Sequence, residues 1–191
     1  MKLKILLLYV VITLTCLNAC TFTGFNKNNF VKEFKGKIEE DKCFLLEVSS
    51  NSEFVSSNEK FYYCKEFIYK LTESISEEIS FISHRLYLKD GSSYYYDGET
   101  VSKTSPVDFS IVKKQVLITL FGDDIKWKKS NDKYVYIKNE YKGSIAKGDC
   151  ENSLNFEITY SAKDVVINYV GKISLFETLD PPMPNVLKDY I

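Results

Sequence analysis

Apolar and polar residues alternate over several stretches of the chain, and a period of two predicts half-buried β-strands. In the clearest stretch, Leu154–Ser161, apolar side chains fall on one face and polar ones on the other. The other stretches that predict strands are Lys42–Ser49, Ile79–Leu88, Tyr94–Tyr96, Ile125–Lys129, Tyr134–Lys142 and Val165–Phe176. The segment Glu59–Ser74 fits a helical face as well as a strand, and we favour strands.

Turn and cap signals divide the middle of the chain. Asp90-Gly91 and Asp97-Gly98 flank the short tyrosine stretch, and Asp-Gly between apolar runs predicts a tight antiparallel hairpin turn. Ser105 as N-cap, Pro106 at the first helical position and Asp108 in the first turn then predict a helix that ends at Gly122. Its predicted apolar face consists of Phe109, Val112, Val116 and Leu120, widened by Leu117 and Phe121.

A second helix is predicted over residues 27–40, where apolar residues recur at helical spacing. The order helix, strands, helix, strands predicts the α+β class: a curved antiparallel β-sheet with about two helices packed on one face. Residues 30–191 are expected to form one globular domain. Three prolines in Leu179–Pro184 predict an extended tail across the surface or along a sheet edge.

The first nineteen residues have the composition of an export signal. Lys2 and Lys4 precede the apolar run Ile5–Leu14, which is too short to cross a bilayer. The segment then ends Leu17-Asn18-Ala19-Cys20, which resembles the lipobox of bacterial lipoproteins.

The resemblance implies cleavage after Ala19, a diacylglycerol thioether on Cys20 and acylation of the new N-terminus, for example with palmitate. Residues 20–29 would be the lipidated cysteine and a short polar tether, and the membrane would be a partner through this lipid. Thr21 stands where an aspartate retains many lipoproteins in the inner membrane, which implies the outer membrane if the organism is Gram-negative. The other interpretation is an ordinary signal peptide cut nearby, with Cys20 a structural thiol.

Charge and cysteine content narrow the function. The chain has 25 basic and 26 acidic residues, so nothing suggests a nucleic-acid partner. Fourteen Tyr and 13 Phe favour a sheet-rich folded domain. Beyond the leader and Cys20, the thiols are Cys43, Cys64 and Cys150. The sequence allows a disulfide between Cys43 and Cys64, but it leaves equally open a pairing with Cys150 and the presence of three free thiols.

Candidate catalytic chemistry is sparse. No glycine-rich phosphate loop, HExxH, GxSxG or paired-cysteine metal pattern occurs, so we expect no enzyme, no cofactor and no metal site. His84, the single histidine, is expected to be structural, and Asp123-Asp124 to form a solvated turn. The candidate binding residues are Tyr94, Tyr95 and Tyr96, because consecutive strand residues point to both faces. Core filling is the alternative explanation for these tyrosines.

The arrangement resembles the LolA and LppX-like group of lipoproteins. The resemblance rests on the hairpin Tyr94–Val101, the helix started by Pro106, the hairpins that follow, and Ile173–Phe176 running into Pro181-Pro182. It implies a half-open curved sheet, covered by helices, whose apolar lumen binds acyl chains.

Two functions follow from these observations. The first is a membrane-anchored, non-enzymatic envelope lipoprotein whose domain binds a protein or another envelope component. The alternative is a carrier or sensor of a lipid or other amphiphile. A carrier needs an apolar cavity of several hundred Å³. We expect the carrier function to fail if the gap between sheet and helices is filled by Phe109, Leu117, Leu154, Phe156 and Ile158.

Overall fold

The computed structural model describes residues 30–191 except 41, 77–78, 122–124, 131–132, 139, 151 and 164. The predicted signal peptide, Cys20, the tether and Asp123-Asp124 lie outside the described residues, as do residues 27–29 of the first predicted helix. The helices are α2 (Phe30–Glu39), α3 (Phe109–Phe121) and α4 (Asn185–Lys188). The strands are β1 (Cys43–Asn51), β2 (Val55–Tyr63), β3 (Phe67–Ser76), β4 (Ser80–Leu88), β5 (Ser93–Tyr96), β6 (Val101–Lys103), β7 (Lys128–Ser130), β8 (Lys133–Lys138), β9 (Tyr141–Lys147), β10 (Ser153–Ala162) and β11 (Val165–Phe176).

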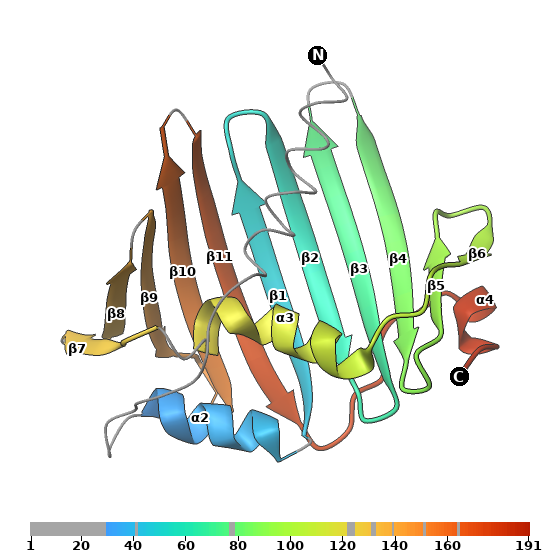
Figure 1. The fold of residues 1–191 in the computed structure, drawn as a ribbon, viewed down its shortest axis with the longest axis horizontal. Coiled ribbons are helices and arrows are strands. Elements are labelled where there is room, and N and C mark those ends of the chain that lie inside the picture. The colour runs from blue at the N-terminus through green and yellow to red at the C-terminus, as the bar shows by residue number, and fades with distance from the viewer. Residues whose placement is uncertain are drawn as a thin grey trace.

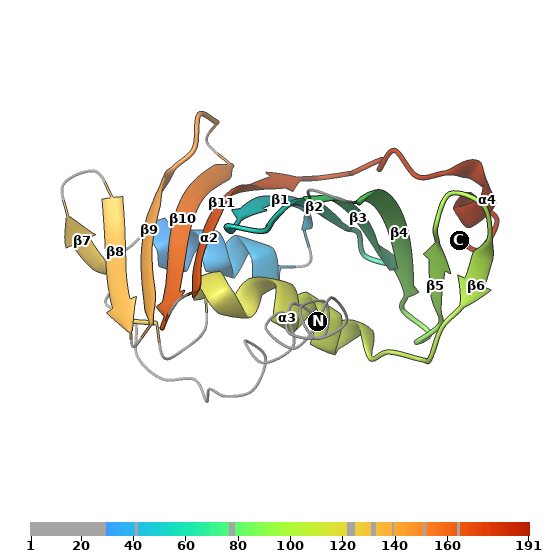
Figure 2. The same ribbon diagram turned by 90° about the horizontal axis from the view of Figure 1, so that it is seen from above.

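All the strands belong to one 11-stranded antiparallel sheet with the order β6-β5-β4-β3-β2-β1-β11-β10-β9-β8-β7. Two meanders, β1 to β6 and β7 to β11, join where the first strand pairs with the last, with Cys43 opposite Phe176 and Asn51 opposite Asn168. Between the two meanders the chain passes from one edge of the sheet to the other through α3 (Figure 1). The sheet curves around α2 and α3, which lie on its concave face (Figure 2).

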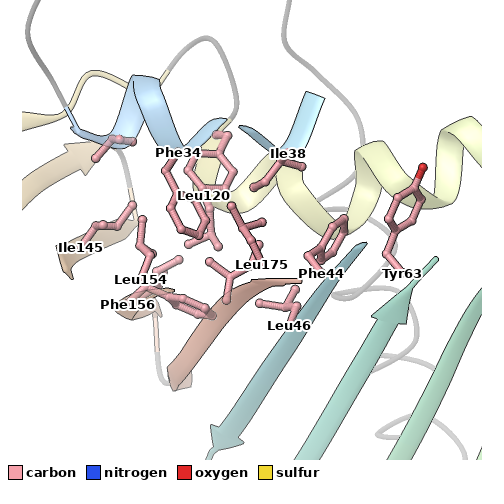
Figure 3. Packing of buried hydrophobic residues seen from close by; sticks show 14 of the residues in the cluster. Phe34, Ile38, Phe44, Leu46, Tyr63, Leu120, Ile145, Leu154, Phe156 and Leu175 are labelled. Atoms are coloured by element: carbon pink, nitrogen blue, oxygen red, sulfur yellow. The ribbon is translucent and has the colours of Figure 1, made fainter. Parts of the chain in front are cut away.

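The concave face carries the main core (Figure 3). Phe34 of α2 stacks on Phe121 of α3 with ring centroids 6.4 Å apart, which joins the two helices. Beneath them lie fully buried aliphatic residues of the central strands, among them Leu154 and Ile173, both 0% exposed. Burial of one such side chain contributes about 1.5–3 kcal/mol, so this cluster holds the two meanders together.

A second cluster lies on the opposite, convex face. The C-terminal segment Leu179–Ile191, hereafter the strap, crosses this face from the end of β11 to α4 beside β5 (Figure 2). Met183 and Leu187 of the strap are buried against three residues of the sheet, which are Tyr62, Tyr69 and Leu86. The predicted extended tail is therefore confirmed, but it ends in a short helix that the sequence analysis did not anticipate.

The predicted fold is confirmed in part. The single antiparallel sheet is present as expected, but the protein is mostly β rather than α+β, because this one sheet is large and the helices are few and short. Glu59–Ser74, which also fitted a helix, forms most of β2 and β3 as favoured. Helices α2 and α3 share one face as expected, but α4 lies with the strap on the other.

The start of α3 also differs from the prediction. The N-cap is Asp108 rather than Ser105: its carboxylate accepts the backbone N–H of Ser110 at 2.8 Å, and its carbonyl accepts that of Val112. The preceding residues stay extended because the N–H of Val107 donates to the carbonyl of Gly91, which ties them to the β4–β5 turn. This non-local bond overrides the Ser-Pro start signal.

Two predicted strands have different boundaries. Tyr134–Lys142, predicted as one strand, is split into β8 and β9, with Lys138 opposite Tyr141. The split places Tyr136 opposite Gly143, where any β-carbon would overlap the tyrosine ring. The predicted strand Ile125–Lys129 is reduced to β7, because Ile125 is buried and Trp127 donates its indole N–H to the carbonyl of Leu120.

Candidate functional site

The three candidate tyrosines do not form one surface. Strand alternation places Tyr94 and Tyr96 on the convex face, where Tyr94 packs on Tyr190 of the strap with ring centroids 4.2 Å apart. Tyr95 points to the concave face, where the guanidinium of Arg85 lies 5.6 Å from its ring centroid. All three are half-buried. The fold thus divides the predicted binding site between two faces, and Tyr94 and Tyr96 have packing roles.

His84 lies on the convex face of β4, beside the strap. The hydroxyl of fully buried Tyr69 is 2.7 Å from its Nδ1 and 3.4 Å from the carbonyl oxygen of Pro182, to which it can donate. Burial lowers the pKa of His84 and raises that of Tyr69, so both are neutral at pH 7. This pair ties the strap to the sheet, which agrees with the structural role expected for the histidine.

Cys43 and Cys64 come together at the end of the sheet that adjoins α2. Phe44 of β1 pairs with Tyr63 of β2, so Cys43 and Cys64, one position beyond this pair, lie opposite each other. Both cysteines are free thiols, and Cys64 donates a hydrogen bond to the carbonyl of Leu179 in the strap. Burial, and to a smaller extent the neighbouring Cys43, raises the pKa of the Cys64 thiol to about 12. The predicted disulfide stays a prediction, now between adjacent thiols, whereas Cys150 is free and exposed elsewhere.

The gap between the sheet and α3 is occupied by side chains. Leu154, Phe156 and Ile158 are buried in the main core, and Phe109 and Leu117 of α3 pack against them as partly buried residues. Nearer β4, the same face turns polar: Lys70 bonds Glu59 at 2.7 Å, and Ser74 donates to Ser57 at 3.1 Å. An acyl chain would find either filled space or charged and hydroxyl groups on these strands.

The far end of the sheet presents a feature to which the sequence analysis assigned no role. Val55 of β2 pairs with Ser76 of β3, and Ile75 of β3 pairs with Ser80 of β4, so the β1–β2 turn lies next to the adjoining ends of β3 and β4 (Figure 1). Five large apolar side chains are exposed there, and these residues are hereafter the hairpin tips: Phe54, Ile75, Ile79, Phe81 and Ile82. The sequence signal was present in the run of four isoleucine and phenylalanine residues between positions 75 and 82, where alternation alone predicted only a strand.

Within the described residues, no group of three or more His, Cys, Asp or Glu side chains could hold a metal ion. No helix among them is both long and apolar enough to span a membrane.

Comparison with known proteins adds little. No protein-family model matches the chain, and no curated protein matches it. Among solved structures, the S-type phycobiliprotein lyase CPES from Guillardia theta is similar over 80% of this chain and 100% of its own length, at 9% identity and a TM-score of 0.26. A likeness this distant carries no argument about what the chain does.

Proposed function

We propose that the protein is an exported lipoprotein, held at the membrane by lipid on Cys20, whose domain binds another component of the cell envelope without catalysing a reaction. The anchor part of the proposal is supported by the leader, with Lys2 and Lys4 before the apolar run Ile5–Leu14 and a lipobox-like ending. More than one acyl chain is needed for stable anchoring, because a single chain binds only marginally. In a Gram-negative cell, the location would be the outer membrane.

The observation that carries the binding proposal is the filled gap between the sheet and α3. A carrier would line this gap with apolar side chains and leave several hundred Å³ for its ligand. Leu154 and Phe156 instead pack against residues of the helices, at 0% and 4% exposed. Recognition is therefore expected on the outer surface, as in an interaction domain.

The anchor is tested by labelling the full chain with an alkyne analogue of palmitate in an exporting bacterial host. We expect label on the wild type and none on Cys20→Ala, with the Cys43→Ala variant as matched control keeping the label. Label that persists on Cys20→Ala would contradict the anchor.

The binding mode is tested by native mass spectrometry of the domain from Thr21 to Ile191, purified from the same host. The proposal predicts a bare protein mass. A co-purifying species of lipid mass that is lost on denaturation would support the carrier function instead.

A further inference from the structure

The hairpin tips expose five large apolar side chains close together. Phe54 is 64% exposed, Ile79 63%, Ile75 58%, Ile82 53% and Phe81 45%. Single exposed apolar residues are normal on a protein surface, but a cluster of this kind marks an interaction site. Since Asn51 pairs with Ser56 and Ile75 with Ser80, all these residues lie within a few positions of the strand ends.

Hydrogen bonds between residues at the ends of each hairpin fix the backbone beside these side chains. In the first turn, the N–H of Ser52 donates to the carbonyl of Val55 at 3.0 Å, and the serine hydroxyl accepts the N–H of Val55. The second turn repeats this construction with Ser76 and Ile79, at 2.8 Å for the backbone bond. A preorganised apolar surface loses little conformational entropy when a partner covers it.

The side chains surround the tips rather than forming a flat face. Strand alternation puts Ile75 and Ile82 on the convex side and Phe81 on the concave side, while Phe54 and Ile79 lie in the turns. A protruding shape of this kind fits a pocket or cleft in a partner.

The ionisable side chains within the tips have one sign. Among the described residues of 51–58 and 71–83 there is no Lys or Arg, and the ionisable side chains are Glu53 and Glu73. Glu53 and Glu73 are exposed next to the apolar residues. An acidic rim favours a basic partner surface and disfavours an anionic lipid surface.

The tips lie at the end of the sheet away from α2. Helix α2 lies at the opposite end, next to the start of β1, and the ten residues of β3 span about 33 Å between the two ends (Figure 1). The helices α2 and α3 therefore leave the tips uncovered.

From these observations we propose that the hairpin tips bind a second protein, at an apolar pocket surrounded by lysine and arginine side chains. This inference rests on the proposed function, because it names the surface and the partner class of the same interaction domain. The partner is a different protein rather than a lipid surface, since exposed Glu53 and Glu73 accompany the apolar residues.

The test is photo-crosslinking of the full, lipidated chain in its membranes, with benzoylphenylalanine in place of Phe54. The matched control carries the same group in place of Ile137, which is 77% exposed on β8. We expect one discrete protein adduct from position 54 and none from position 137. The crosslinked partner peptide should contain apolar residues flanked by Lys or Arg.

Two further variants test the chemistry of the contact. In the position 54 background, Ile79→Ser and Glu73→Lys should each reduce the adduct at least about tenfold, the loss expected for a central interface residue. Raising the salt to 0.5 M should weaken it as well. Circular dichroism should show both variants folded, because the changed residues are exposed.

Several outcomes would overturn the inference: an adduct to phospholipid, an adduct to a second copy of the chain, no adduct, or one that neither variant weakens. The proposed function has its own two tests, palmitate labelling of Cys20 and the native mass of the domain. If Cys20 is labelled and the domain has a bare mass but no adduct forms, the tips are rejected as the binding surface while the proposed function stands.

Discussion

The two ends of the sheet use similar residues in opposite ways. At the end next to α2, aromatic and aliphatic side chains are covered by helices on the concave face and by the strap on the convex face. At the hairpin tips, phenylalanine and isoleucine side chains of the same kind stay exposed. Burial of an apolar residue in this protein thus depends on what covers its strand position. Exposed apolar residues that the fold could have covered are the ones to examine for function.

The largest contrast is expected between matched aliphatic truncations at the two ends. Leu154→Ala removes a fully buried side chain from the main core and should cost about 2–5 kcal/mol of unfolding free energy. Ile82→Ala at the exposed tips should change it by less than about 0.5 kcal/mol. Urea unfolding of both variants measures the difference. Equal losses would mean that the tips are buried in solution.

The second prediction concerns the cysteines at the packed end. In protein from an exporting host, Cys43 and Cys64 should be oxidised, closing a loop of about 20 residues worth on the order of 3 kcal/mol. Of Cys43, Cys64 and Cys150, a thiol count under denaturing conditions should then find only Cys150 as a free thiol. Cys43→Ser should lower stability to that of the reduced wild type. Three reactive thiols in the exported wild type would refute the disulfide.

In the reduced protein the two kinds of thiol should differ in reactivity. The pKa of Cys64, raised to about 12 by burial, leaves almost no thiolate at pH 8. Iodoacetamide should therefore alkylate exposed Cys150 well before Cys64, as peptide mass spectrometry over a time course can follow. Equal rates would show that the Cys64 end of the sheet opens readily.

Attachment of the strap is tested by removing one hydroxyl. Tyr69→Phe deletes the buried group shared by His84 and Pro182 and should cost about 1–2 kcal/mol in urea unfolding. Tyr96→Phe is the matched control, because its hydroxyl bonds the carbonyl of Gly98 at an exposed site and should matter less. A larger loss of unfolding free energy from Tyr96→Phe than from Tyr69→Phe would show that the contact of Tyr69 with the strap does not stabilise the fold.

The smallest expected effect is a pH dependence. The folded pKa of His84 is lowered by burial, so its contribution is fully present above the unfolded pKa, near 6.5, and is lost as the pH falls through the folded pKa. His84 is the single histidine, so the difference in urea midpoint between wild type and His84→Gln isolates this term. The wild type should lose more stability than the variant between pH 7.5 and 5.5. Parallel curves would contradict the burial of the imidazole.

Much of the secondary structure could be predicted because it depends on neighbouring residues. The alternation in Leu154–Ser161 matches β10, and the Asp-Gly pairs mark the turns on either side of β5. The candidate site could not be predicted in the same way. Tyr94, Tyr95 and Tyr96 form one stretch of sequence, yet the pleat and the strap assign them different surroundings.

The sequence by itself determined most strands and the presence of a helix after β6, while the leader with its lipobox-like ending stays a prediction. Only the tertiary structure decided that β1 pairs with β11, that the strap covers the convex face, and that the hairpin tips are bare. The reason is physical: alternation shows that one face of a strand is suited to burial but not which distant segment will cover it. That choice depends on contacts between residues far apart in the chain, such as Val107 and Gly91 before α3, where the backbone hydrogen bond prevails over the local Ser-Pro start signal.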